Sequence, residues 1–587
     1  MQLKKLLSKG YFPKELPPPF NSESFGDKSR YINKKWTDLL NYNQARRPGE
    51  SGKDANKRFR KDYIEKYGSS SLIEFSIAKG IFSRRKLEIP NPKQYLDLSN
   101  PVVDNWKTIR DYFDISNYSQ SKPVLFEAKR ALKTKSKSLN NFKFEAISKS
   151  FGRKVELRLD ILNFYPTIYT HSIPWSLLGK EDAKKYFKIK STRQAHFNTL
   201  LSTDAKARLY KLGDTIDTLV RNCNERQSIG IPIGPDTSFL VAELIGCRID
   251  KEIQNSLAGI SHECIRYYDD YFFYLNSVGD ADNVLKKVQK ILYEFRLETN
   301  EFKVSINQLP FKYVDDWSLT LSNFKFNSAN NYELRNYFSQ LISLVDKNKK
   351  QSSWIINYGL QRFEYGNVKI SRKHFDIFLT FLLQLLLFDP SNIDQVFKIL
   401  LSYEYYLSKK RKDKIENVLN QIIEEHSILN HSFEVSWALW FYKSFRIKCH
   451  RDYLTLVLAS NDSISKLICV DLINSKLFKG RKPALANLIA SLNSNSVFNE
   501  DWLIAYETFR KKWLNFGTRN LLDKNEFFEI LDYYDVTFYD STRQIETSFS
   551  VNPPPEIEPD DFDSWFDDFL NEDDDEDETK EEKKAKY

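Results

Sequence analysis

The alternation of apolar and polar residues changes character along this chain. Between about Ser71 and Lys312, short β-type runs alternate with helical runs, the pattern of a mixed helix and strand unit. Beyond about Asn327, apolar residues recur at three- and four-residue spacing, which predicts successive amphipathic helices. The clearest segments are Tyr332–Val345, His374–Phe388, Ile393–Leu407, Lys414–Ile428 and Glu434–Phe445. Helices of this length without a strict sequence period favour a helical bundle or an irregular α-repeat array.

The two ends of the chain differ from these sections. Residues 1–70 join a proline-rich stretch, Leu16–Pro19, to a basic stretch, Lys53–Lys61, which predicts an extended arm followed by a helix. Residues 551–587 hold 16 Asp and Glu against 4 Lys, which predicts a disordered acidic tail. Four domains are therefore predicted: the N-terminal arm and helix at 1–70, an α+β unit at 71–325, an α-helical repeat domain at 326–550 and the tail at 551–587.

The charge balance points toward a polyanionic partner. The chain of 587 residues carries a formal net charge of +9, and since the tail contributes −12, residues 1–550 carry +21. Such a basic body attracts polyanions, most commonly nucleic acid, although a lysine-rich soluble surface explains the charge nearly as well. The five cysteines show no CxxC pair, so neither a disulfide framework nor a cysteine zinc site is indicated. The most apolar run, Ile377–Phe388, is too short to span a bilayer, and we expect a cytoplasmic protein without membrane partners.

A first candidate for chemistry ends a predicted strand. In Val155–Leu162, apolar residues alternate with Glu156, Arg158 and Asp160, which is the pattern of a half-buried strand. Pro166 follows shortly after this run and interrupts strand pairing, because proline has no backbone N–H to donate. Asp160 therefore lies at a strand end, where a carboxylate facing a cleft suits a metal ligand.

A second candidate is the pair Asp269-Asp270, which lies between two aromatic, β-favouring runs in Ile265–Leu275. This arrangement predicts two acids at the bend of a tight hairpin. Adjacent buried carboxylates repel each other unless a cation neutralises them, and Mg²⁺ prefers such oxygen ligands. Chance occurrence is the alternative in a chain with 32 Tyr, and we do not regard the similar run Asp532–Asp535 as catalytic.

A third candidate is the loop Gly230–Ser238, which precedes an apolar helical pattern from Phe239 to Ile249. Its glycines and prolines predict a rigid loop that a nucleotide or base pair can approach closely, and Thr237 or Ser238 is expected to cap the helix. The alternative is a purely structural role, because Gly-Pro turns before helices are common.

Taken in order, these motifs resemble those of reverse transcriptases, and more closely those of abortive-infection (Abi-type) and related defence-associated bacterial enzymes. The resemblance rests on Asp160–Trp175 (DILNFYPTIYTHSIPW), on Gly230–Ser238 and on Arg266–Asp270 (RYYDD). It implies an α+β right-hand polymerase, with fingers and a palm containing an antiparallel sheet, followed by an all-α helical-repeat domain. Phe82–Pro92 is similar to the fingers element.

The resemblance also implies residue roles. Asp160, Asp269 and Asp270 are the catalytic acids and bind two Mg²⁺ ions, for which Mn²⁺ can substitute, with the Ile161 carbonyl oxygen as a further ligand. Tyr165 is the expected steric gate against a ribose 2′-hydroxyl, and Lys303 is expected near the triphosphate. The nucleotide-binding set is Phe164, Tyr165, Arg84, Arg85, Gly230, Pro232, Gly234 and Lys303.

The implied activity is RNA-directed DNA polymerase chemistry, in which dNTPs are added to a 3′-hydroxyl or a protein hydroxyl, with or without a template, in antiphage defence. DNA product, an RNA template, dNTPs and a homo-oligomer are the implied partners. Ile229 replaces the glutamine that usually precedes the central loop, which leaves templated copying less certain than the chemistry. The alternative is a catalytically silent palm that serves as a nucleic-acid-binding scaffold for a helical effector domain.

Overall fold

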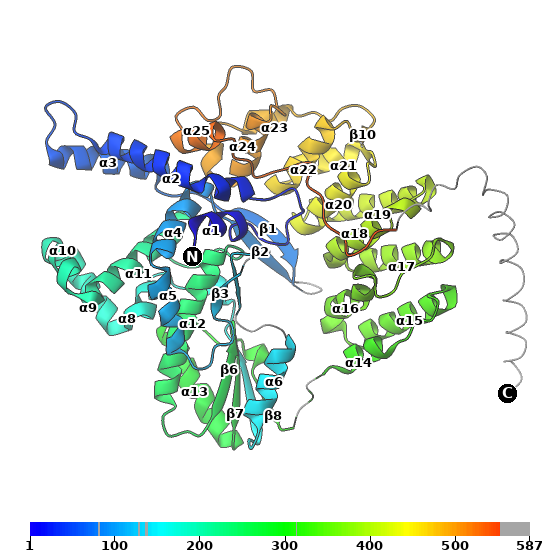
Figure 1. Ribbon diagram of the computed structural model, residues 1–587, viewed down its shortest axis with the longest axis horizontal. Helices are drawn as coiled ribbons and strands as arrows, with labels where there is room; N and C mark the ends of the chain where they lie inside the picture. Colours follow the sequence, from blue (N-terminus) through cyan, green and yellow to red (C-terminus); the bar gives the residue numbers. More distant parts are fainter. Residues whose placement is uncertain (80–82, 127–129, 135–138, 311, 313, 552–587) are drawn as a thin grey trace, which may run out of the picture.

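The computed structural model describes residues 1–551 except 80–82, 127–129, 135–138, 311 and 313 (Figure 1). Within this range the chain is mostly helical, with small antiparallel sheets and one short parallel strand pair. Residues 552–587 of the predicted acidic tail lie outside the described residues. Every described helix is too short or too polar to cross a membrane.

A four-stranded antiparallel sheet carries the candidate acids. Its strand order is β6-β7-β5-β8, and its strands are β5 (Val155–Asp160), β6 (Glu263–Tyr267), β7 (Asp270–Leu275) and β8 (Ser305–Gln308). Helix α13 (Val278–Glu294) contacts β5 and β7, and Phe142 of α6 (Leu139–Ser150) packs against Phe272 of β7. The strand predicted at β5 is confirmed, but it is not half-buried, because its polar residue Glu156 is only 1% exposed.

A second hairpin and further helices complete this section of the chain (Figure 1). The hairpin consists of β1 (Ile73–Ala78) and β2 (Arg84–Ile89), which pair antiparallel from Ile73↔Ile89 to Ala78↔Arg84. The short strands β3 (Pro123–Leu125) and β4 (Leu132–Thr134) form a further antiparallel pair. The remaining helices here are α4 (Pro92–Asp104), α5 (Trp106–Tyr112), α7 (Phe164–Thr167), α8 (Ser172–Leu178), α9 (Lys180–Thr192), α10 (Gln194–Thr203), α11 (Ala205–Asn222) and α12 (Asp236–Ser256).

The five helices predicted beyond Asn327 are confirmed, with small shifts at their ends. They are α15 (Asn331–Lys347), α17 (Phe375–Phe388), α18 (Ile393–Ser402), α19 (Lys409–Ser427) and α20 (Ser432–Ser444). The other elements are α14 (Asp316–Asn323), α16 (Ser352–Glu364), β9 (Cys449–His450), α21 (Arg451–Ala459), α22 (Ser463–Asn474), β10 (Phe478–Lys479), α23 (Ala486–Ser491), α24 (Trp502–Arg510) and α25 (Glu526–Tyr533). Successive contacts link α15, α17, α19 and α21 in one row and α16, α18, α20, α22 and α24 in another (Figure 1).

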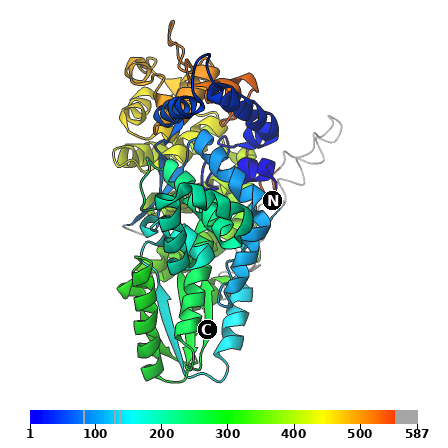
Figure 2. The same ribbon diagram turned by 90° about the vertical axis from the view of Figure 1, so that its left-hand side faces the viewer.

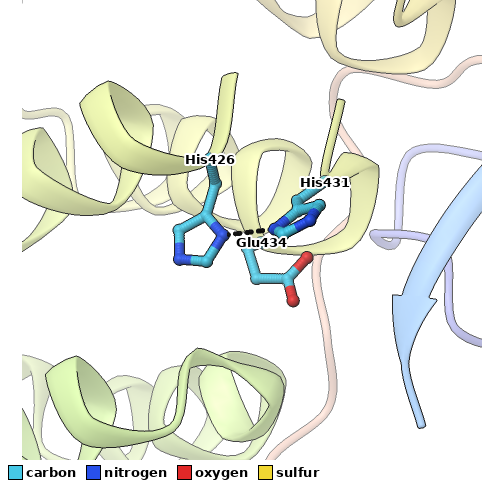
Figure 3. Close-up of side chains that lie close together, drawn as sticks. All are labelled: His426, His431 and Glu434. Carbon is cyan, nitrogen blue, oxygen red and sulfur yellow. Dashed lines mark hydrogen bonds between the residues drawn. The ribbon is translucent and has the colours of Figure 1, made fainter. Parts of the chain in front are cut away.

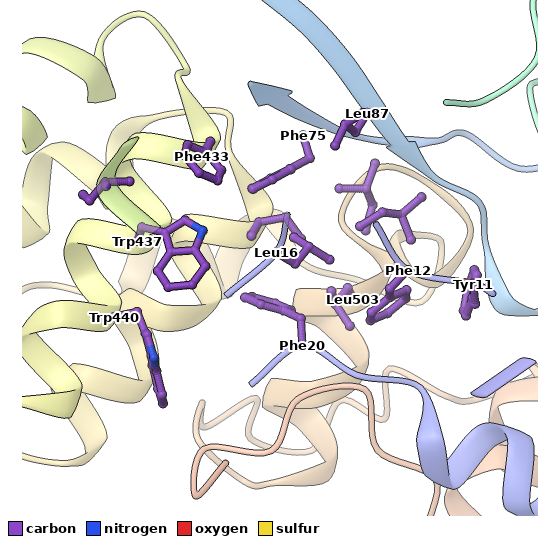
Figure 4. Packing of buried hydrophobic residues seen from close by; sticks show 14 of the residues in the cluster. Tyr11, Phe12, Leu16, Phe20, Phe75, Leu87, Phe433, Trp437, Trp440 and Leu503 are labelled. Atoms are coloured by element: carbon purple, nitrogen blue, oxygen red, sulfur yellow. The ribbon is translucent and has the colours of Figure 1, made fainter. Parts of the chain in front are cut away.

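The N-terminal segment differs from the predicted extended arm. It forms three helices, α1 (Leu3–Lys9), α2 (Glu23–Gln44) and α3 (Gly52–Tyr67), and α2 and α3 lie at the opposite end of the molecule from the four-stranded sheet (Figure 2). The proline-rich stretch is a packing element, because Leu16 and Phe20 are each 6% exposed. In Figure 4, Leu16 lies close to Phe75 of β1 and Trp437 of α20, and Phe20 lies on the side of Leu16 away from Phe75.

This packing joins the first residues of the chain to the last described ones. The indole Nε1 of Trp437 donates to the Glu15 carbonyl at 3.0 Å, and the Asp540 amide donates to the Pro19 carbonyl at 2.8 Å. Proline cannot donate a backbone hydrogen bond, but its carbonyl and ring remain available for such contacts. One contiguous hydrophobic core therefore runs from α1 to residue Tyr539.

Candidate active site

Strand pairing brings the three candidate acids to one edge of the sheet. Asp160, the last residue of β5, lies opposite Asp270, the first residue of β7. The predicted hairpin is confirmed, since Tyr268 and Asp269 form the turn between β6 and β7. The Ile161 amide donates to the Asp269 carbonyl at 3.2 Å, so Ile161 also lies at this edge.

Tyr268 holds this turn in an unusual backbone conformation. Its φ is +54°, a value that costs free energy for a bulky residue and persists only where surrounding contacts impose it. The Tyr268 amide donates to Ser121 Oγ at 3.0 Å, and its carbonyl accepts from Arg266 Nη1 at 2.7 Å. Contacts on both sides of the residue therefore fix the turn that carries Asp269.

Arg266 belongs to a buried ionic network beneath the turn. It is 1% exposed and binds two acids of α12, with Nη2 at 2.8 Å from Glu243 and Nε at 2.9 Å from Asp250. Although burial acts to raise it, the pKa of Glu243 is lowered because Arg266 stabilises the carboxylate. A Cβ atom at Gly246 would come within 2.9 Å of the Arg266 guanidinium, so this glycine makes room for it. Sequence reasoning missed the network, although two acids seven residues apart on the apolar face of a helix were a usable signal.

The carboxylates at the sheet edge have too little positive charge nearby to offset their burial and mutual repulsion. Burial raises the pKa of Asp270 to about 6, and the neighbouring charge of Asp269 adds to the shift. Burial, followed by the charge of Asp160, also raises the pKa of Asp269. Asp160 is 5% exposed, and it accepts hydrogen bonds from Lys303 Nζ and, at 3.2 Å, from Asn300 Nδ2. These oxygen ligands and raised pKa values suit a hard divalent cation.

The three acids do not form a ready three-ligand cluster in this arrangement. Among the described residues, oxygen or nitrogen ligands from three side chains meet within 4.8 Å only at His426, His431 and Glu434. Lys303 supplies the cation at Asp160 instead, through a salt bridge in which the lysine side chain is 51% exposed. A half-exposed ammonium is readily displaced, because pairs of this kind contribute little free energy.

Tyr165 and Phe164 lie in α7, directly after the β5 strand end. Both lie around a space too small for a water molecule, whose other lining residues are Phe239, Ala242, Glu243 and Tyr268. The predicted gate therefore packs close to the Tyr268 turn and to α12. Burial also raises the pKa of the Tyr165 hydroxyl, which stays protonated at neutral pH.

Contacts with three other segments of the chain hold the Gly230–Ser238 loop in place. Gly230 has a φ of +88°, and its amide donates to the Ile168 carbonyl at 2.9 Å. Gly234 has a φ of +134°, and a Cβ atom there would come within 2.9 Å of Pro13 Cγ. Between them Pro232 is buried, and the Ile233 carbonyl accepts from the Glu88 amide at 2.8 Å. These contacts explain the predicted rigidity of the loop.

The predicted capping of α12 is wrong. The helix begins at Asp236, its N-cap residue is Pro235 and no side chain caps it, so Thr237 and Ser238 lie inside the first turn. The Asp236 carboxylate accepts from the Leu132 amide at 3.0 Å and pairs with Arg130. Asp236 thus connects the loop to the β4 strand in place of a cap.

The two candidate arginines of β2 have different environments. The Arg84 guanidinium pairs with both oxygens of Glu434 in α20, at 2.6 and 2.8 Å, so this structure shows it engaged away from the acids. Arg85 is exposed, and its positive charge acts to lower the pKa of Asp269. Of the two, Arg85 is the one whose charge reaches the candidate acids.

Comparisons with known proteins identify a class of solved structures but no family. No family model matches the chain, and no curated protein matches it. The solved structures with similarity to this chain include telomerases, about two thirds of whose length is matched. Telomerase from Candida albicans in complex with a TWJ fragment of telomeric RNA is 11% identical, with a TM-score of 0.26 and coverage of 64% of this chain and 66% of that chain. Candida tropicalis telomerase with the same kind of fragment is 10% identical, with a TM-score of 0.29 and coverage of 66% of this chain and 67% of that chain. The apo form of Candida tropicalis telomerase is 12% identical, with a TM-score of 0.29 and coverage of 77% of this chain and 71% of that chain.

Proposed function

We propose that this chain is a nucleotidyltransferase of the reverse-transcriptase class, which adds dNTPs to a 3′-hydroxyl or protein hydroxyl with two Mg²⁺ ions. The observation that carries the proposal is the pairing of Asp160 with Asp270 across β5 and β7, with Asp269 in the adjoining turn. In this proposal the four-stranded sheet is the palm, the β1–β2 hairpin belongs to the fingers, and the helices after Asn327 form the repeat domain.

The residues at the sheet edge have distinct roles in the proposed reaction. Asp160, Asp269 and Asp270, with the Ile161 carbonyl, would hold the ions, which when bound activate the attacking hydroxyl and neutralise phosphate charge. Because burial raises the pKa values of Asp269 and Asp270, bound cations would stabilise the ionised forms of both carboxylates.

The remaining candidates would position the nucleotide. Arg85 would bind triphosphate oxygens, since a guanidinium forms paired charge-assisted hydrogen bonds with phosphate. Lys303, whose ammonium lies at Asp160, would donate a proton to the leaving pyrophosphate. Tyr165 would exclude the ribose 2′-hydroxyl of an incoming nucleotide, since it lies close to Tyr268 in the turn that carries Asp269.

The biological setting belongs to the same proposal. The charge of +21 on residues 1–550 supports a nucleic-acid partner. The antiphage role, bacterial source, homo-oligomer and Mn²⁺ substitution rest on the resemblance of the Asp160–Trp175 and Arg266–Asp270 motifs alone.

Incorporation of labelled dNTPs by the purified full chain, with Mg²⁺ or Mn²⁺ and without added template or with an RNA template, tests the activity. We expect extended product from the wild type and at least a thousandfold less from Asp269→Asn, at a Tm no lower than that of the wild type. Asp535→Asn is the matched control, because Asp535 is an exposed acid in the second tyrosine–aspartate run. Absence of product from the wild type with either metal would favour the silent scaffold, whereas product from Asp269→Asn at the wild-type rate would overturn the proposed role of Asp269.

A further inference from the structure

A second cluster of metal-binding side chains lies far along the sequence from the candidate acids, in the C-terminal helices (Figure 3). His426 lies in the last turn of α19, His431 is the N-cap residue of α20 and Glu434 lies in the first turn of α20. The Nδ1 atoms of the two histidines are 2.7 Å apart, and one ligand atom of each of the three residues lies within 4.8 Å of the others. We propose that His426, His431 and Glu434 form a transition-metal site, with Zn²⁺ as the expected ion.

The donor set selects the type of ion. Two imidazoles and one carboxylate are a ligand set that Zn²⁺ accepts when a fourth position is left to water or another small ligand. Mg²⁺ and Ca²⁺ prefer oxygen ligands alone, so this cluster discriminates against the ions proposed for the palm. The spacing His-x4-His-x2-Glu follows from the sharp turn between α19 and α20, which contains Asn430 at a φ of +51°.

Small adjustments of the imidazole rings suffice for shared coordination. Two nitrogens bound to one tetrahedral ion at 2.0–2.1 Å lie about 3.3 Å apart, so the rings must separate by about half an ångström. In the observed hydrogen bond one Nδ1 carries a proton and the other accepts it. On metal binding that proton moves to Nε2 of its own ring through solvent, and the ring stays neutral.

The surroundings favour metal binding. Burial lowers the pKa of both imidazoles, while the nearby charges of Glu434 and Arg84 act in opposite directions, Glu434 raising it and Arg84 lowering it. The Glu434 side chain is 2% exposed and pairs with Arg84, which occupies one acceptor position on each oxygen. A carboxylate has about four such positions, so two remain for an ion.

Arg84 has the geometry of an outer-shell partner. Its Nε donates to Ser76 Oγ at 2.9 Å and one Nη donates to the Ser76 carbonyl at 3.0 Å, so β1 and β2 hold the guanidinium that orients Glu434. Ligating carboxylates are commonly held by such hydrogen bonds. The fourth coordination position can be supplied from a pocket of about 500 Å³, which is lined by all three ligands and by Arg84, Lys349 and Ser391. The pocket is open enough for water and an ion to enter.

The test uses Co²⁺ as a probe, because tetrahedral Co²⁺ absorbs visible light when it occupies a zinc site. Titration is performed on chelator-treated full-length Asp269→Asn protein, so that the palm acids contribute little to binding. We expect one equivalent of Co²⁺ to develop tetrahedral d–d bands, which added Zn²⁺ then abolishes. Absence of these bands at saturating Co²⁺ would overturn the proposal and leave a simple hydrogen-bonded histidine pair.

Variants and a direct spectroscopic readout separate ligation from folding. His426→Gln and His431→Gln should each weaken Co²⁺ binding at least tenfold, whereas His196→Gln, which alters an exposed histidine of α10, should not. Equal binding by all four proteins would contradict the site. If a ligand variant fails to fold, X-ray absorption at the zinc edge of the Zn²⁺-loaded protein decides the question, because two imidazole scatterers are expected and their absence excludes His426 and His431.

Discussion

Lys303 donates a hydrogen bond from its ammonium to Asp160, at the position where Asp160 faces Asp270 across the sheet. Although burial disfavours its charge, this contact raises the pKa of Lys303. The lysine thus partly supplies the positive charge that the three acids require, and in the proposed enzyme it competes with a metal ion for Asp160.

Removal of the Lys303 charge should therefore ease metal binding. We expect Lys303→Gln to lower the Mg²⁺ concentration for half-maximal dNTP incorporation by up to about fivefold, since a half-exposed ion pair contributes about 0.2–1 kcal/mol. Lys286→Gln on the exposed face of α13 is the control and should leave it unchanged. An equal or higher Mg²⁺ requirement for Lys303→Gln would contradict this competition.

Asp270 should destabilise the metal-free protein at neutral pH. Burial raises its pKa to about 6 from an ordinary value near 4, so the stability associated with its neutral form is present below pH 4 and is lost as the pH rises to 6. In EDTA at pH 7.5, Asp270→Asn should raise the free energy of unfolding by about 1–2 kcal/mol after allowance for solvent screening. Thermal melting should show this gain at pH 7.5 and none near pH 4, and a lower Tm at pH 7.5 would argue against it.

Replacement of Arg85 should change nucleotide binding, whereas replacement of Arg84 should change stability. Arg85→Ala should raise the KM for dNTPs about tenfold, because one charge-assisted phosphate contact is lost. Arg84→Ala should instead lower the Tm, since it leaves the buried Glu434 carboxylate unpaired. Steady-state kinetics and melting of both variants check this division, and a larger KM effect for Arg84→Ala would reverse the assignment.

Tyr165 should control sugar discrimination. If it excludes the 2′-hydroxyl, Tyr165→Val should raise the relative kcat/KM for ribonucleotides about tenfold to a hundredfold. Tyr293→Val changes a tyrosine that is 80% exposed on α13 and serves as the control. Parallel incorporation assays with each dNTP and its ribonucleotide give the ratio, and equal ratios for the two variants would reject the gate.

The buried Arg266 should be essential for stability. Arg266→Met leaves Glu243 and Asp250 without their cation and should destabilise the fold by about 3–5 kcal/mol. Urea denaturation should show a lower midpoint, whereas Lys251→Met, on the exposed face of the same helix, should have little effect. A midpoint equal to that of wild type would mean that the acids find other partners or become protonated without cost.

Local patterns in the sequence predicted the elements that carry Asp160, Asp269 and Asp270. Alternation identified β5, the paired acids between aromatic runs identified the β6–β7 hairpin, and helical spacing identified α15 and α17 to α20. These features depend on residues close together in the chain, so periodicity and turn chemistry suffice.

Contacts between distant segments were not predictable in this way. Strand β8 has the sequence SINQ, which lacks a clear apolar alternation, and only its pairing with β5 makes it a strand. The pairing of Arg84 with Glu434 joins residues 350 positions apart, and no local pattern in the sequence indicates it. Half-burial was likewise assumed for β5 because nothing local indicates that both faces of the sheet are covered.

The hydrogen bond between Pro19 and Asp540 and the bridge between Phe20 and Tyr539 have a consequence for biosynthesis. A ribosome must complete the last described helices before the first segment can reach its final position. Until then Leu16 and Phe20 remain uncovered, and such surfaces favour aggregation or chaperone capture. Release from the ribosome, rather than emergence of the candidate acids, would then limit the appearance of folded protein.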